Sequence, residues 1–447
     1  MLSAFGNAFK TPDLRKKILF TLFILAVFRL GSTIPSPNVN LENIHACQVE
    51  AAAGDAAGLY SMINLFSGGA LLQLAIFALG IMPYITASII LQLLTVVIPR
   101  LEKLKKEGGA GQTKITQYTR YLTIVLAVMQ STAFTTLAVN GQLFQGCSRP
   151  VVYDSSIFPI IVMVLTMTAG TGIIMWMGEL ITDRGIGNGM SVMIFTQIAA
   201  QFPTQMWSIA LGKGTDPNNP NMPNAAGWLA FAMVLALGLL VMLGVIFMEQ
   251  AQRRIPVQYA KRMVGRRLVG GTTTYIPLKV NQAGVIPIIF ASSMLYLPML
   301  YAQFQTGNPV SSWIAQHLSG SGSPWYNAVY FVLIIAFTYF YVSITFDPVE
   351  VADNMKKYGG FVPGIRAGRP TEKYLAYVLS RLTAPGSLYL ALISLLPALA
   401  WFLLGEVASR KFPFGGTSIL IIVGVGLDTV KQIESQLQQR NYEGFLR

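Results

Sequence analysis

The strongest constraint on this chain is a series of ten apolar stretches, most of them long enough to cross a lipid bilayer. Only 11% of the 447 residues are charged and 53% are hydrophobic, whereas soluble domains usually carry about 25% charged residues. A membrane-spanning helix needs roughly 20 apolar residues. We therefore predict an all-α polytopic membrane protein with ten transmembrane helices. The stretches lie at residues 18–34, 71–98, 118–139, 157–181, 190–210, 227–248, 283–301, 325–346, 382–404 and 415–430.

The basic residues are distributed asymmetrically between the two sides of the membrane. With the N-terminus placed inside, 27 of the 32 Lys and Arg residues fall in cytoplasmic segments and four fall in outer segments. Cytoplasmic loops carry an excess of Lys and Arg, so we expect both termini in the cytoplasm. Five spans on each side of the 210–227 connection further predict two inverted halves, residues 1–210 and 211–447.

Two cytoplasmic loops, at residues 249–282 and 347–382, are longer and more basic than a helix connection requires. The general excess of Lys and Arg in cytoplasmic loops explains why these two loops are positively charged, but it does not explain why they are so long. We therefore expect docking surfaces for an acidic or nucleic-acid partner in these loops.

The apolar stretches hold almost no ionisable residue near their centres. Arg29 lies close enough to the end of its span for the side chain to reach the interface, and His45 and His317 fall in outer loops. We recognise no phosphate-binding loop and no buried pair of nucleophile and base, so we expect no enzyme, and we expect no metal or cofactor. A secondary transporter of small solutes is the main alternative, because inverted halves and broken helices would also suit it.

The two cysteines of the chain, Cys47 and Cys147, fall in the first and second outer loops. This is an oxidising location in many bacteria. A disulfide between them and two free thiols are both compatible with this placement.

Short motifs follow one another in a recognisable order along nearly the whole chain. They are NLFSGGA at 64–70, FALGIMPYI at 77–85, KEG at 106–108, RGIGNG at 184–189, QRR at 252–254, KVN at 279–281, AGVIP at 283–287, FVPGIR at 361–366 and FGGTS at 414–418. Together they resemble the SecY family of bacterial protein-translocation channels. The resemblance implies a ten-helix clamshell, with helices 1–5 facing helices 6–10 around an hourglass pore. Such a channel would pass unfolded secretory proteins across the membrane and release transmembrane segments sideways into lipid.

The resemblance also assigns a narrow ring to the middle of the pore. It would consist of Ile81, Ile85, Met190, Ile194, Ile289 and Ile421. The first four form two pairs spaced four apart, so each pair shares one helix face. Ordinary helix packing is the alternative explanation of that spacing. Met190 stands where a branched aliphatic residue is usual in the family, and its flexible thioether predicts a softer seal.

The same resemblance predicts a plug at about residues 60–72 and a lateral gate between the second and seventh helices. The plug would contain Ile63, Asn64, Leu65, Phe66, Ser67, Gly68 and Gly69, and a simple interfacial helix is the alternative. The gate would involve Thr86, Gln130, Asn281 and Ile286. For its polar members, separate side chains that bond to their own backbone are the alternative.

The resemblance further implies partners in the bacterial plasma membrane and on its cytoplasmic side. These are the SecE and SecG subunits, the SecA ATPase, the ribosome, signal sequences of secretory and membrane proteins, membrane lipids, and, as further candidates, SecD, SecF and YidC. Arginines at the tips of the cytoplasmic loops would contact SecA or the ribosome. They are Arg253, Arg254, Arg266, Arg267 and Arg366.

Overall fold

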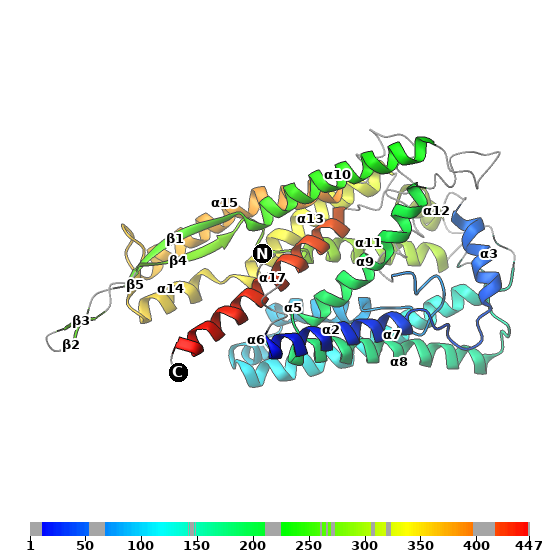
Figure 1. The fold of residues 1–447 in the computed structure, drawn as a ribbon, viewed down its shortest axis with the longest axis horizontal. Coiled ribbons are helices and arrows are strands. Elements are labelled where there is room, and N and C mark those ends of the chain that lie inside the picture. Colours follow the sequence, from blue (N-terminus) through cyan, green and yellow to red (C-terminus); the bar gives the residue numbers. More distant parts are fainter. Residues whose placement is uncertain are drawn as a thin grey trace.

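The protein folds into long helices that run side by side, with a narrow arm of strands beyond one end (Figure 1). The computed structural model describes residues 11–52, 68–141, 143, 147, 149–210, 225–259, 262–264, 267–269, 273–304, 309–318, 323–396 and 416–445. The helices are α2 (Pro12–Gly31), α3 (Leu41–Ala52), α5 (Met82–Val97), α6 (Pro99–Lys106), α7 (Gly109–Val139), α8 (Ile157–Arg184), α9 (Gly189–Ala210), α10 (Ala225–Gln250), α11 (Ile286–Phe304), α12 (Pro309–Leu318), α13 (Pro324–Thr345), α14 (Pro348–Lys357), α15 (Arg369–Ser394) and α17 (Gly416–Phe445). The strands are β1 (Gln252–Tyr259), β2 (Arg262–Val264), β3 (Arg267–Val269), β4 (Thr273–Lys279) and β5 (Gly360–Phe361).

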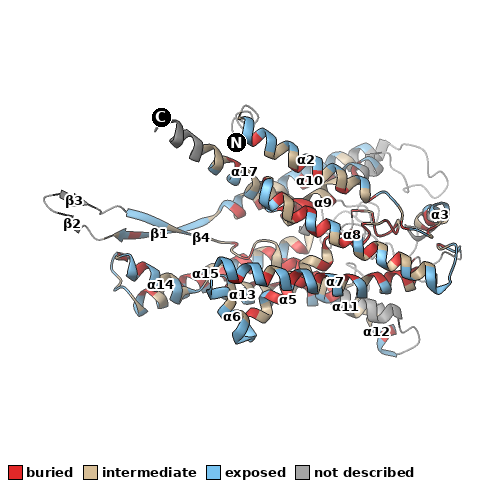
Figure 2. Cartoon of the chain, turned by 90° about the horizontal axis from the view of Figure 1, so that it is seen from below, coloured by how far each residue is buried: buried red, intermediate tan, exposed pale blue. Residues whose placement is uncertain are grey.

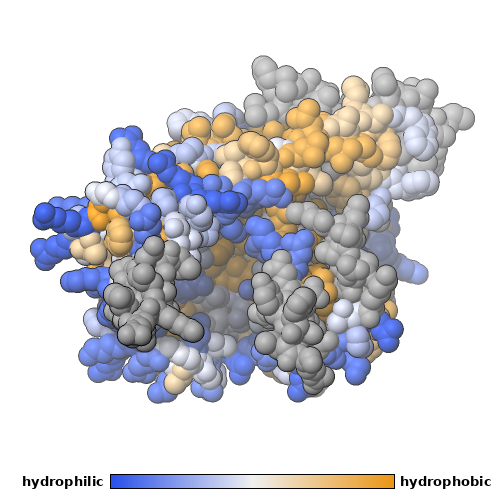
Figure 3. Space-filling view, turned by 60° about the vertical axis from the view of Figure 1, so that its left-hand side comes forward, coloured by the Kyte–Doolittle hydropathy of each residue, from blue (hydrophilic) through white to orange (hydrophobic). Residues whose placement is uncertain are grey.

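The outer faces of the helices are apolar, as lipid-facing surfaces must be. Within the described residues, five helical stretches are long and apolar enough to cross a membrane, and α5 and α6 pass the same test as a pair bent by 101°. Leu243 and Phe247 of α10 are 67% and 76% exposed. Figure 3 shows hydrophobic side chains gathered over a broad part of the surface, whereas Figure 2 shows the buried residues on the inner faces of the helices. This distribution supports a multi-pass membrane protein.

Several helices extend beyond the apolar stretches that predicted them. Helix α7 begins at residue 109 rather than 118, α15 begins at 369 rather than 382, and α17 continues to 445 rather than 430. Hydropathy detects only the part of a helix that contacts lipid, whereas these helices continue into water with polar residues. The helices are therefore longer at these ends than the apolar stretches predicted from the sequence.

The prediction of one helix over residues 71–98 was wrong in its first half. Residues 68–81 form turns, with φ angles of 47° at Leu74 and 56° at Gly80. The helix begins only at Met82, with Pro83 in its first turn, where the missing N–H of proline costs no hydrogen bond. The turn segment pairs with the chain after α2 instead, through Ile76 N–H to Ile34 O at 2.9 Å. Irregular backbone is tolerated at membrane depth only where protein satisfies its polar groups in this way.

The expectation of a purely α-helical chain was also wrong, because the two long loops form a small sheet. Strand β1 pairs antiparallel with β4, from Gln252↔Lys279 to Gln258↔Thr273, and β5 pairs with the end of β1. On one face, Ile255 and Val257 are 2% and 1% exposed. They pack into a core with Leu278, Met355, Val362, Leu375 and Val378. Residues of the 249–282 and 347–382 loops therefore form one folded unit.

A disulfide joins Cys47 of α3 to Cys147, at the end of the molecule opposite the sheet (Figure 1). Their Cα atoms are 5.4 Å apart and 100 residues separate them in sequence. Both belong to a cluster that includes Ile44, Leu72 and Leu74. The bond therefore ties the outer helix α3 to the segment between α7 and α8, next to the irregular stretch before α5.

Glycines in α8 provide a test of how closely this helix packs against the turn segment 68–81. A Cβ added at Gly170 would overlap the carbonyl oxygen of Ile76, whereas a Cβ at Gly172 would meet nothing within 4 Å. Gly170→Ala should lower the free energy of unfolding by about 1–3 kcal/mol, because a backbone carbonyl cannot move aside cheaply. Gly172→Ala, the matched control, should be neutral or slightly stabilising. Thermal unfolding in detergent measures both, and equal melting temperatures would contradict the close approach of α8 to the turn segment.

Candidate functional site

A cavity of about 670 Å³ lies among helices from distant parts of the chain. Its walls come from α5, α7, α8 and α9 on one side and from α11 and α17 on the other, with the end of α10 and residues 279–285 beside the sheet. Among the residues the structure describes, no group of three or more His, Cys, Asp or Glu side chains could hold a metal ion. The lining combines aliphatic side chains with charged ones, and we call its charged part the mouth.

Residues predicted for the pore ring form an apolar part of the cavity lining, which we call the waist. Five of the six line the cavity, namely Ile85, Met190, Ile194, Ile289 and Ile421. Ile81 does not line it; this side chain is 1% exposed and packs in one cluster with Ile85, Met190 and Ile194. The structure thus brings the apolar side chains of α5, α9, α11 and α17 to a common space.

Residues next to Met190 in the chain and on α8 fix its position at the waist. The side-chain oxygen of Asn188 accepts a hydrogen bond from the backbone N–H of Met190 at 3.2 Å, just where α9 begins. A Cβ at Gly178 would overlap the Met190 sulfur, and a Cβ at Gly189 would overlap the Gly178 carbonyl oxygen. Glycine at both positions therefore allows the start of α9 to lie directly against α8.

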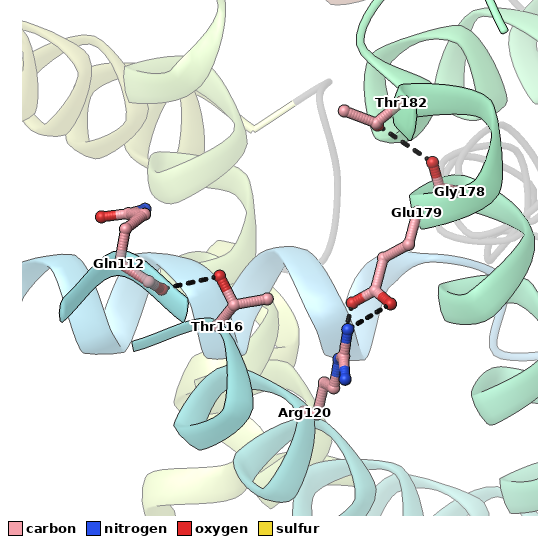
Figure 4. Close-up of polar contacts among 6 residues, drawn as sticks. All are labelled: Gln112, Thr116, Arg120, Gly178, Glu179 and Thr182. Carbon is pink, nitrogen blue, oxygen red and sulfur yellow. Dashed lines mark hydrogen bonds and ion pairs between the residues drawn. The ribbon is translucent and has the colours of Figure 1, made fainter. Parts of the chain in front are cut away.

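An ion pair crosses one wall of the cavity, from α7 to α8. Arg120 donates from Nε to Glu179 Oε1 at 2.8 Å and from Nη2 to Oε2 at 2.7 Å (Figure 4). This two-bond geometry fixes the relative orientation of the two groups as well as their distance. The neighbouring hydroxyls of Thr116 and Thr182 donate to their own helices (Figure 4).

The opposite wall carries a second set of polar groups, between α10 and the sheet. Asn281 Nδ2 donates to Glu249 Oε1 at 2.5 Å, and both residues are buried. Lys279 Nζ lies 3.7 Å from Asp428 Oδ1 of α17. Sequence reasoning did not single out Glu249, because it lies at the end of an apolar stretch, where a charged residue is ordinary.

The polar residues predicted to hold the lateral gate shut are not bonded to one another. Thr86 donates to the Met82 carbonyl of its own helix at 2.9 Å, and Asn281 bonds to Glu249. Among the described residues, no hydrogen bond joins Thr86, Gln130 and Asn281. A threonine hydroxyl in a helix satisfies itself on the preceding turn when no better partner is near. The apolar gate residue Ile286 does line the cavity.

Of the predicted plug residues, Gly68 and Gly69 are described, and Ile63 to Ser67 lie outside the described residues. Arg29 Nη1 donates to the Gly68 carbonyl oxygen at 3.0 Å. The Arg29 side chain thus finds an acceptor within the protein, at the described end of the predicted plug. Arg29 and Gly68 both line a second cavity, of about 250 Å³.

Of the arginines predicted to contact partners, those whose side chains are described lie at the sheet end of the molecule. Arg253 and Arg254 are exposed on β1, where consecutive side chains point to opposite faces. Arg366 is exposed between β5 and α15, and its carbonyl oxygen accepts a hydrogen bond from Thr371 Oγ1 at 2.8 Å. Arg266 and the side chain of Arg267 lie outside the described residues.

Comparison with known proteins gives a consistent result. Residues 75–430 match the model of the family described as SecY. The chain is 64% identical to the protein translocase subunit SecY of Streptomyces galbus over 100% of both chains. Two solved structures share the fold: a SecY whose plug domain is described as stabilising the closed state of the translocation channel (TM-score 0.59, 20% identity), and Sec61 in a canine ribosome–channel complex (TM-score 0.56, 16% identity). Each comparison covers 94% of this chain and 91% of the other.

A double-mutant cycle tests the Arg120–Glu179 pair. Arg120→Ala and Glu179→Ala should show a coupling of about 1 kcal/mol in the free energy of unfolding, because two charge-assisted bonds are lost together. The matched control is the ion pair between Glu102 and Lys106 on α6, whose side chains are 49% and 74% exposed. That pair should show no measurable coupling, and equal coupling in both cycles would contradict a structural role for the cavity-wall pair.

Proposed function

This chain belongs to the SecY family, and from that premise we propose that it is the pore-forming subunit of a protein translocase. The observation that carries the proposal is the convergence of apolar side chains from α5, α9, α11 and α17 on one cavity. The family is one of pores rather than catalysts. An unfolded secretory protein passes through this pore, and a partner ATPase or the ribosome supplies the energy.

The proposed topology has ten spans in two inverted halves, residues 1–210 and 211–447, with both termini in the cytoplasm of a bacterial plasma membrane. Two observations support it. The basic residues lie mainly on the proposed inner side. The disulfide lies at the end opposite the sheet, and an oxidised pair of cysteines fits the outer compartment.

The apolar waist acts as a seal that opens for a wide substrate. A narrow ring of aliphatic side chains excludes water and ions by dewetting, and it makes no directional bond that an entering chain would have to break. Met190 adds a flexible side chain to the ring, which lets it adapt to segments of different width. Ile81 supports Ile85 from behind by packing in the same cluster.

The plug, at about residues 60–72, closes the outer side of this seal in the resting state. Its described end supports the proposal, since Arg29 holds the Gly68 carbonyl and Gln48 Nε2 donates to the Leu72 carbonyl at 2.9 Å. A Cβ at Gly68 would lie 3.4 Å from the Gln197 backbone, so the plug base lies close to α9.

The lateral gate lies between α5 and α11. These helices meet through a small apolar cluster in which Ile85 and Ile89 of α5 contact Ile289 and Phe290 of α11. Contacts of this kind are non-directional, so the apolar face of a signal sequence can replace them. Because the signal-sequence helix binds the open state more tightly than the closed state, it shifts the equilibrium toward opening. The proposed gate also includes Thr86, Gln130, Asn281 and Ile286, of which Asn281 and Ile286 line the cavity.

The sheet and the loops around it form the docking surface for SecA and the ribosome. Arg253, Arg254, Arg266, Arg267 and Arg366 supply charge for acidic side chains or RNA phosphates. The apolar outer faces of the spans contact lipid and the small subunits SecE and SecG.

Crosslinking tests the pore. A photoreactive residue in place of Ile85 or Ile289 should capture a stalled secretory precursor, because both positions line the cavity. The matched control is Ile288, which is 0% exposed and packs with Leu295 rather than lining the cavity. Equal capture at Ile288 and Ile289, or none at Ile289 while the precursor is stalled, would show that the chain takes another path.

Charge reversal tests the docking surface. Arg366→Glu should abolish SecA-driven transport into proteoliposomes while the purified channel keeps its melting temperature. Arg100→Glu makes the same charge change at an exposed cytoplasmic position on α6, away from the sheet, and should have little effect. Unchanged transport with Arg366→Glu would remove this residue from the contact.

A further inference from the structure

The charged residues that line the pore cavity have the opposite balance from the chain as a whole. The chain carries 32 Lys and Arg residues against 19 Asp and Glu. The cavity is lined by more carboxylates than cations: Glu179, Asp183, Glu249 and Asp428 against Arg120 and Lys279. The charged part of the cavity lining is thus acidic, although the cytoplasmic side of the protein is strongly basic.

Both cations of this mouth already have partners. Arg120 is held by both oxygens of Glu179, and Lys279 lies within 4 Å of Asp428. Within the described part of the chain, no Lys or Arg forms an ion pair with Glu249. Glu249 thus has no cation in direct contact, and Lys279 and Lys431 act on its charge only from a distance.

Glu249 is the carboxylate that most needs a partner. It is 9% exposed, and Asn281, which donates to its Oε1 atom, is 4% exposed. The Oδ1 atom of Asn281 is buried and accepts no hydrogen bond, and the same holds for Oε1 of Gln282 next to it. Burying a carboxylate without a cation is costly, and so is burying an acceptor without a donor. Both needs are met by a group with positive charge and several N–H donors, which describes a lysine or arginine side chain.

We propose that Glu249 and Asn281 form a binding site for a basic side chain of the polypeptide that enters the channel. The proposal rests on the proposed function and specifies which part of the substrate this wall recognises. A secretory signal sequence begins with a positively charged segment that is followed by an apolar one. The cavity offers both complements, since the acidic pair lies beside the sheet while Ile85, Ile286 and Ile289 line the same space. Glu249 and Asn281 therefore hold the charged segment on the cytoplasmic side while the apolar segment lies against α5 and α11.

Two precursors that differ only in the charge of their first segment test the site. One carries lysines ahead of its apolar segment, and the other carries glutamines at the same positions. The measured quantity is the ratio of their transport rates into proteoliposomes with the complete translocase. Glu249→Gln keeps the size of the side chain and an acceptor for Asn281. It should reduce the preference for the basic precursor by about fivefold, the effect of one partly buried charged contact.

The matched control is Glu350→Gln, which removes the same charge from an exposed position on α14, outside the cavity. It should keep the wild-type ratio. An unchanged ratio in Glu249→Gln would overturn the proposal, as would an equal loss in both variants, since that would be a general effect of charge.

Direct contact is tested with a carbodiimide, which joins a carboxylate to a neighbouring amine without a spacer. A stalled precursor with one lysine before its apolar segment should be crosslinked to Glu249, and replacing that lysine by arginine or Glu249 by Gln should abolish the product. A product that persists in Glu249→Gln would place the lysine at another carboxylate. If wild-type translocase moved neither precursor, the proposed function itself would fail, whereas transport with an unaltered charge preference in Glu249→Gln would refute the site alone.

Discussion

The structure depends on one constraint, namely that backbone N–H and C=O groups surrounded by lipid need partners within the protein. Helices meet this need by themselves, and most of the chain is helical. The segment 68–81 is not helical; some of its backbone groups bond within its own turns, and others bond to Ile34, Ser36 and Arg29. Irregular backbone is confined to a place enclosed by other helices. This is also the place where a pore needs a part that can move.

A second consequence concerns charge. Several ionisable groups at the ends of the apolar helices line the cavity, and they pair between elements rather than along one helix. Arg120 joins α7 to α8, and Lys279 joins the sheet to α17. These pairs frame the cavity mouth without reaching the apolar waist. The waist is thus lined by uncharged side chains, as the proposed seal requires, and the charged groups of the mouth remain for the proposed recognition of the substrate.

Several elements could be predicted from the sequence because their signals are local. The length of an apolar stretch predicts a membrane span. Helical spacing, together with the family resemblance, points to residues such as Ile85 and Ile289, which line one cavity in the structure. The sheet was missed because its local signals are short: the alternation of Ile255 and Val257, and the β-branched and aromatic residues of 273–276, lie within a polar, basic segment. The contacts of Arg120 with Glu179, 59 residues away, and of Glu249 with Asn281, 32 residues away, have no local signal at all. They depend on how the helices pack.

The outer end of the molecule combines a fixed frame with a releasable segment. The disulfide between Cys47 and Cys147 holds α3 covalently, and α3 in turn presents Gln48 to the Leu72 carbonyl. The base of the proposed plug is held by this bond and by Arg29, and each hydrogen bond contributes only about 0.5–1.5 kcal/mol net, somewhat more for the charged donor. Together the two hydrogen bonds thus contribute at most a few kcal/mol to holding the base of the proposed plug. The disulfide fixes α3, and with it Gln48, independently of whether the bond to Leu72 is formed.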